Sequence, residues 1–188
     1  MNEHERLKLK VCLVGDQGVG KSSLIRRFVL NAFDDHYLAT VGTKVSKKLM
    51  WITIPGNGVT IEVDMQVWDI MGEPDFRGAL RASYFAGAQG ILAACDVTRR
   101  ATLEGILSWV DLADEVTVNP AWCVVGNKAD LRDKAAFGED ELARLAGSLG
   151  SPHMLTSART GENVERAFQA LTRSVFVGMR RSGLASLP

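Results

Sequence analysis

Short apolar runs alternate along the chain with segments whose apolar residues recur at helical spacing. The runs over residues 90–97 and 121–127 are continuously apolar, which is typical of strands buried on both faces of a sheet. Residues 7–14 also read as a strand, and they lead directly into a glycine-rich turn. Two further strand-like runs, 44–54 and 59–68, flank the sequence PGNG, which predicts the turn of an antiparallel hairpin.

Helical periodicity lies between these strands. Apolar residues recur at i, i+3, i+4 and i+7 in three segments, which begin at Leu103, Leu142 and Val164. Strands that alternate with such helices predict an α/β fold whose mostly parallel sheet is covered on both faces, with one antiparallel strand at an edge. Ligands of such sheets bind beyond the carboxyl ends of the strands, and the polar motifs described below all fall there.

Composition narrows the class of protein. The chain has 188 residues, of which 46% are hydrophobic, which suits one compact domain with short tails. Basic and acidic residues balance at 22 each, so nothing indicates a nucleic-acid partner. The three cysteines lie singly inside apolar runs and are predicted to be buried in a reducing, cytoplasmic protein. We expect no signal peptide, membrane span or lipid anchor, so that any membrane contact is indirect.

A phosphate-binding pattern follows the first strand. Residues 15–22 read GDQGVGKS and match G-x-x-x-x-G-K-[ST], and a helix begins near Lys21. The backbone N–H groups of such a loop and the positive end of the helix dipole bind a phosphate. Lys21 is expected to reach the β- and γ-phosphates and the Ser22 hydroxyl to bind Mg²⁺. A plain glycine turn is the weaker alternative, because four fixed positions match.

A candidate base-reading motif follows the strand at 121–127. Its residues are Asn127, Lys128, Ala129 and Asp130. An aspartate carboxylate accepts hydrogen bonds from both the N1–H and the exocyclic amine of guanine, a pair of donors that adenine lacks. Asp130 is therefore predicted to select guanine, Lys128 to lay its stem over the base, and Asn127 to tie this loop to the phosphate loop.

With these two motifs the chain resembles the small GTPases, most closely the Ras and Rab branch. The resemblance covers about residues 7–178 and leaves tails at 1–6 and 179–188. It implies a Ras-like P-loop fold with a six-stranded, mostly parallel sheet. It also implies a monomer that binds GTP or GDP with Mg²⁺, hydrolyses GTP, and meets effectors and regulators through residues 34–45 and 70–84.

The resemblance assigns further binding residues. The sequence TSAR at 156–159 is similar to the family's S-A-K loop, where the Ala158 N–H would contact the guanine oxygen and Arg159 replaces lysine. Phe33 resembles the aromatic that lies edge-on to guanine, with a core phenylalanine as the alternative. The implied nucleotide-binding set is Gly15, Asp16, Gln17, Gly18, Val19, Gly20, Lys21, Ser22, Ser23, Phe33, Tyr37, Thr40, Gly72, Asn127, Lys128, Asp130, Leu131, Ser157, Ala158 and Arg159.

Two segments resemble the family's switches. The sequence YLATVG at 37–42 is similar to Y-x-x-T-I-G, and Thr40 would bind Mg²⁺ in the GTP state. The sequence WDIMGE at 68–73 is similar to W-D-x-x-G-Q; Asp69 would hold Mg²⁺ through a water, and the Gly72 N–H would meet the γ-phosphate. Such contacts order the loops with GTP and release them after hydrolysis. The implied metal ligands are Ser22, Thr40 and Asp69.

Two positions depart from the family pattern. Glu73 stands where hydrolysing members carry the glutamine that orients water. Two unit charges about 5 Å apart repel by roughly 3 kcal/mol at an effective dielectric near 20, so Glu73 is expected to slow hydrolysis. A protonated Glu73 would instead mimic glutamine, and one that faces solvent would contribute nothing. Gln17 would either crowd the γ-phosphate or supply the missing amide. The implied catalytic set is Lys21, Thr40, Gly72, Glu73 and Gln17.

Other interpretations stay open at this stage. A non-hydrolysing nucleotide-binding adaptor is one alternative, and a P-loop kinase is a second, although no arginine-bearing lid is found in the sequence. Arg77 and Arg81 are either solvated or act as an arginine finger. The hairpin at 44–68 is longer than is usual in the family, so it is either a partner surface, with Trp51 near its tip, or a tolerated extension.

Overall fold

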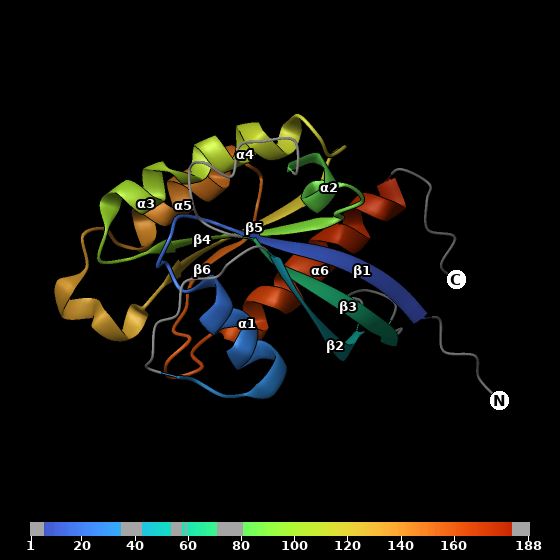
Figure 1. Ribbon diagram of the computed structural model, residues 1–188, viewed down its shortest axis with the longest axis horizontal. Helices are drawn as coiled ribbons and strands as arrows, with labels where there is room; N and C mark the ends of the chain where they lie inside the picture. Colours follow the sequence, from blue (N-terminus) through green and yellow to red (C-terminus); the bar gives the residue numbers. More distant parts are fainter. Residues whose placement is uncertain (1–5, 35–42, 54–57, 59, 71–80, 182–188) are drawn as a thin grey trace.

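The computed structural model describes residues 6–34, 43–53, 58, 60–70 and 81–181. They form a twisted sheet with helices on both faces (Figure 1). The elements, in chain order, are β1 (Arg6–Val14), α1 (Lys21–Leu30), β2 (Thr43–Thr53), β3 (Thr60–Ile70), α2 (Arg81–Phe85), β4 (Gly90–Asp96), α3 (Arg100–Glu104), α4 (Ile106–Asp114), β5 (Ala121–Asn127), the 3₁₀ segment η2 (Ala129–Lys134), α5 (Glu139–Ser148), β6 (His153–Leu155) and α6 (Val164–Arg181).

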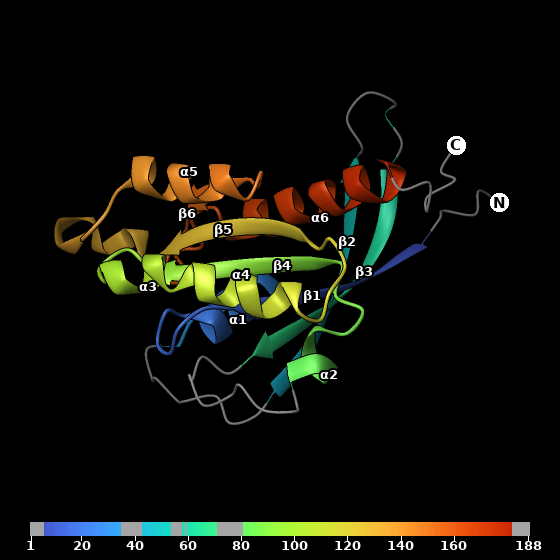
Figure 2. The ribbon, with the colours of Figure 1, turned by 90° about the horizontal axis from the view of Figure 1, so that it is seen from above.

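The sheet has six strands in the order β2-β3-β1-β4-β5-β6. β2 pairs antiparallel with β3, and the other four pairings are parallel. The predicted α/β class, mostly parallel sheet and antiparallel edge strand are therefore confirmed. After β1 the chain forms β2 and β3 on one side of it and then crosses to β4 on the other side. Ligands of open α/β sheets bind at such a switch point. Figure 2 shows β5, β4 and β1 side by side.

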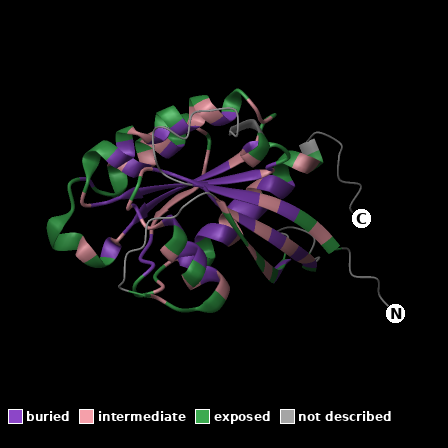
Figure 3. Ribbon diagram, viewed as in Figure 1, coloured by how far each residue is buried: buried purple, intermediate pink, exposed green. Residues whose placement is uncertain are grey.

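Two apolar layers enclose the sheet. α1 and α6 cover one face, where the Phe28 and Phe168 rings stack with centroids 3.8 Å apart. The other face packs against α2 to α5 (Figure 1). β4 is buried along its whole length, as its continuous apolar run predicts, and Figure 3 shows the buried residues concentrated in the central strands. β3 instead alternates buried and half-buried residues, which is typical of a strand with only one face fully packed against the core.

The buried cysteines agree with the sequence prediction. Cys12, Cys95 and Cys123 are all free and buried, and burial raises the pKa of each thiol to about 12. They serve as small apolar groups of the core. No helix in the described part of the chain combines the length and apolar character needed to cross a bilayer.

Two features of the fold are not evident from periodicity. The helical pattern that begins at Leu103 is divided between α3 and α4 at Gly105, which lies against the phosphate loop. A Cβ at Gly105 would stand 3.0 Å from the Asp16 carboxylate, so a larger residue here would press on that side chain. The sixth strand, β6, has only three residues, all half-buried, and pairs with β5 alone. Such a short strand carries no readable alternation.

The aromatic stack predicts where the fold is most sensitive. We expect Phe168→Ala to lower the free energy of unfolding by about 3–5 kcal/mol, since it leaves a cavity against Phe28 under a fully buried side chain. Urea unfolding in one fixed buffer measures the change. Val177→Ala is the control on the same helix, where the side chain is 51% exposed. A loss within 1 kcal/mol for Phe168→Ala would contradict the assignment of the stack to the core.

Candidate functional site

The phosphate loop joins the end of β1 to the start of α1. Its backbone uses positive φ values at three glycines, 135° at Gly15, 76° at Gly18 and 99° at Gly20. A Cβ at Gly15 would lie 2.1 Å from the Ala94 carbonyl oxygen, and one at Gly20 would lie 2.4 Å from Asn127 Nδ2. Both distances are impossible for real atoms, so the loop can pass between β4 and the base-reading motif only with glycine at these two positions.

Lys21 lies folded across this loop. Its side chain is 7% exposed, and its Nζ donates to the carbonyl oxygens of Gly15 at 2.6 Å and Asp16 at 3.1 Å. Burial lowers the pKa of Lys21 to about 8, against the opposing pull of the Asp69 and Asp16 carboxylates. The loop therefore holds a desolvated ammonium group, and this arrangement suits a phosphate anion.

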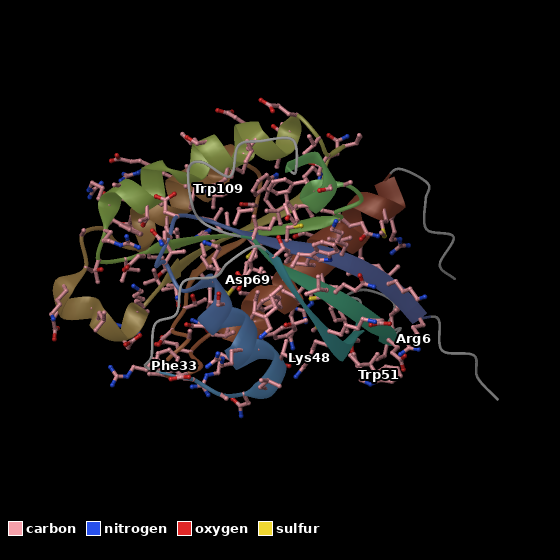
Figure 4. The ribbon with its side chains drawn as sticks, viewed as in Figure 1. Arg6, Phe33, Lys48, Trp51, Asp69 and Trp109 are labelled. Carbon is pink, nitrogen blue, oxygen red and sulfur yellow. The ribbon has the colours of Figure 1, made fainter. Side chains whose placement is uncertain are left out.

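Ser22 and Asp69 bring two oxygen donors together beside Lys21. The Ser22 hydroxyl donates to Asp69 Oδ2, although the two residues come from α1 and from the end of β3. Asp69, labelled in Figure 4, is 4% exposed and lies near the carboxyl end of β3. A hydroxyl and a carboxylate are hard oxygen ligands of the kind that Mg²⁺ prefers, so these two residues fit the predicted metal. Thr40, the third predicted ligand, lies outside the described residues.

Asn127 connects the loops of the site. It is 1% exposed, and its Nδ2 donates to the Val19 carbonyl oxygen at 2.9 Å. Its Oδ1 accepts from the Ala158 N–H at 3.1 Å and from Thr156 Oγ1 at 3.4 Å. One buried amide thus ties the phosphate loop and the segment around Ala158 to the end of β5. The geometry agrees with the expectation that Asn127 links the base-reading and phosphate loops.

The base-reading side chains are also held in place. Ser157 Oγ donates to Asp130 Oδ1 at 2.5 Å, so the aspartate on η2 is bonded to the neighbouring loop. Lys128 has a φ of 67°, and its Nζ lies 2.7 Å from Asp96 Oδ2 at the end of β4. The structure therefore brings Lys128, Asp130, Ser157 and Ala158 together at the carboxyl ends of β5 and β6.

Arg27 is a part of this site that the sequence reading missed. From α1 its Nε donates to the Ala158 carbonyl oxygen at 2.9 Å, and its Nη2 donates to the Arg159 carbonyl oxygen at 2.6 Å. These bonds fix the peptide groups on either side of Arg159. Because the partners are 131 and 132 residues away along the chain, no local pattern marks the role of Arg27.

Trp109 and Asp96 were missed as well. Trp109, labelled in Figure 4, lies on α4. Its indole nitrogen donates to Asp16 Oδ1 at 3.3 Å and so anchors the second residue of the phosphate loop. Asp96 ends a fully buried strand, and that position gives a sequence signal that could have identified it.

The remaining predicted residues are less buried or lie outside the described part of the chain. Gln17 and Arg159 are exposed, whereas Ser23 and Leu131 are half-buried. Phe33 is half-buried and packs against the core cluster beneath α1 and α6, as a core phenylalanine would. Four predicted switch residues lie outside the described residues: Tyr37, Thr40, Gly72 and Glu73.

Comparison with known proteins agrees with this geometry. Residues 10–177 match the profile of the Ras family. The chain belongs to the Ras family. It is 34% identical to the Ras-related protein RABD2c of Arabidopsis thaliana over 93% of this chain and 84% of that protein. It is 37% identical to RABA5b of the same plant over 97% and 81%, and 34% identical to the GTP-binding protein YPTM2 of Zea mays over 93% and 83%. The resemblance to small GTPases is confirmed, and membership implies a GTP-binding switch.

The lowered pKa of Lys21 predicts a pH dependence of nucleotide binding. Below about pH 8 the ammonium form of Lys21 dominates, and the negative charge of bound phosphates raises its pKa back toward the ordinary value. Above about pH 8 the empty site is increasingly neutral, so binding must take up a proton and the affinity for GDP is expected to fall as the pH rises. Calorimetric titration between about pH 7 and 9, in two buffers of different ionisation enthalpy, measures the uptake. Lys21→Gln is expected to abolish it, and an affinity that stays constant across this range would contradict the prediction.

Proposed function

We propose that this protein binds GTP and GDP with Mg²⁺, hydrolyses GTP slowly, and exchanges protein partners between the two states. The observation that carries the proposal is the buried Asn127 amide, which joins the phosphate loop to both loops at the base-reading end. A phosphate site and a guanine site held at a fixed separation by one side chain match a guanine nucleotide, which fills both. A simple anion would fill only the phosphate site.

Each part of the site then has a chemical role. The loop N–H groups and Lys21 neutralise phosphoryl charge, which is the main electrostatic task in phosphoryl transfer. Ser22 and Asp69, with Thr40, hold the metal, which when bound supplies positive charge to the phosphate oxygens. The Asp130 carboxylate accepts hydrogen bonds from the N1–H and the exocyclic amine of guanine. The guanine oxygen accepts from the Ala158 N–H, and in doing so it competes with Asn127 Oδ1.

The partner surface is proposed to include residues 34–45 and 70–84. Support comes from the adjacent strand β2, the edge strand of the sheet, where Val45, Leu49 and Trp51 are between 43% and 50% exposed on one face. Exposed apolar side chains in a row are typical of protein interaction sites. We also infer a cytoplasmic monomer, with residues 7–178 as its nucleotide-binding domain.

The nucleotide that copurifies with the protein, followed by its turnover, tests the central proposal. We expect close to one guanine nucleotide per chain, little ATP, and single-turnover hydrolysis of GTP to GDP. Asp130→Ala is expected to lower GDP affinity by at least a hundredfold, since it leaves the guanine donors without a charged acceptor. Stable GTP with no turnover would favour a non-hydrolysing adaptor, and a preference for ATP would favour a P-loop kinase.

Glu73 is the proposed reason for slow hydrolysis. We expect Glu73→Gln to raise the single-turnover rate at least about tenfold, because it removes a charge repulsion of more than about 1.4 kcal/mol and restores an amide donor. The control is Glu62→Gln, the same chemical change in the ion pair with Arg6 on the sheet. Glu73→Ala separates the remaining alternatives. If the alanine variant hydrolyses GTP at the wild-type rate, Glu73 has no part in catalysis.

A further inference from the structure

Arg99 contacts the backbone of the phosphate loop at Gln17. It follows β4 in the turn before α3, and its Nη2 donates to the Gln17 carbonyl oxygen at 3.0 Å. A Cβ at Gly18 would stand 3.6 Å from the same nitrogen. The next residue, Arg100, turns to the opposite side, where it bonds to the Ala136 carbonyl oxygen and Glu141. Only the first of these two arginines therefore contacts the nucleotide site.

A buried carboxylate anchors the other end of the Arg99 guanidinium. Arg99 Nε donates to Asp96 Oδ2 at 3.1 Å, and the Asp96 side chain is 2% exposed. Burial alone would raise the pKa of Asp96, but hydrogen bonds from Lys128 and from the Thr98 hydroxyl and N–H hold it below its ordinary value. Asp96 is therefore charged at neutral pH. A guanidinium held by a carboxylate on one edge presents its remaining donors in a fixed plane.

The bond to the Gln17 carbonyl also orients the next peptide N–H. A trans peptide is planar, so the carbonyl of one residue and the N–H of the following residue point in opposite directions. None of the described peptide bonds is cis. With the Gln17 carbonyl directed at Arg99, the Gly18 N–H points to the other side of the loop. The left-handed backbone of Gly18, with φ 76°, is typical of the anion-binding nests formed by successive N–H groups.

Arg99 also acts on the phosphate site through its charge. Arg99 Nη2 bonds to the Gln17 carbonyl oxygen, and Lys21 Nζ bonds to the carbonyl oxygens of Gly15 and Asp16 in the same loop. The two cations therefore lie close enough to interact. An anion bound at Lys21 lies within reach of the potential of Arg99.

We propose that Arg99 is a positioning residue of the phosphate loop, which holds the Gln17 carbonyl so that the Gly18 N–H is fixed as a donor to a nucleoside diphosphate or triphosphate. This inference rests on the proposed function. It goes further by giving the loop an external brace, made of Arg99 and Asp96, that no glycine or lysine of the motif supplies. Asp96 also binds Lys128, so the brace connects the phosphate loop to the base-reading loop.

Release of a fluorescent GDP analogue tests the role of Arg99. We expect Arg99→Ala to release the analogue about tenfold faster than the wild type, the usual effect of losing one charge-assisted hydrogen bond. Arg99→Lys is expected to release it severalfold faster as well, because an ammonium cannot serve Asp96 and the Gln17 carbonyl in one plane. Arg100→Ala is the control and should release it at the wild-type rate. A wild-type rate in either Arg99 variant would overturn the proposal, and Arg99→Lys answers the question if Arg99→Ala does not fold.

Two further readouts separate positioning from general loosening. In ¹⁵N-labelled protein bound to GDP, Arg99→Ala should shift the Gly18 amide resonance and Arg100→Ala should not. The preference for GDP over inosine diphosphate should stay unchanged, because Asp96 keeps Lys128 as its partner. A changed preference or an unmoved Gly18 resonance would overturn the proposal. A wild-type protein that fails to bind GDP would instead overturn the proposed function.

Discussion

The side chain of Asn127 is the interaction on which the rest of the site depends. An amide is one of the few groups that can donate to one loop and accept from another while carrying no charge, so it can be buried at 1% exposure without a large desolvation cost. Its two functions are both used, toward Val19 and toward Ala158. A substitution that removes either the donor or the acceptor of Asn127 would leave a buried backbone group without its hydrogen bond and would also disconnect two loops.

Around this centre, two arginines and a tryptophan hold the loops through hydrogen bonds. Arg27 holds the loop around Ala158, Arg99 holds Gln17, and Trp109 holds Asp16. In each case a long side chain on a helix, or on the turn before one, reaches a loop that lies far away along the chain. The ligand-binding groups are therefore kept in place before a ligand arrives, which lowers the ordering cost of binding.

The fold and the centre of the site could be predicted because their signals are local. Continuous apolar runs mark β4 and β5, and the phosphate loop is specified by eight successive residues. The bracing residues could not be predicted in this way. Arginine is usually exposed to solvent, so nothing in the sequence marks Arg27 or Arg99 as structural. Their partners are 131 and 82 residues away along the chain. β6 could not be predicted for another reason: its three residues are all half-buried, so they show no alternation of apolar and polar positions.

The Asn127 bonds to Val19 and Ala158 have a consequence for how the protein is made. The phosphate loop follows the first strand, whereas the segment around Ala158 adjoins the last strand, β6, so the complete site exists only when the whole sheet has formed. A chain still on the ribosome holds the lysine and glycines of the loop long before it holds the groups that recognise a base. Nucleotide binding is then linked to the final stage of folding, and the cellular nucleotide pool stabilises finished molecules alone.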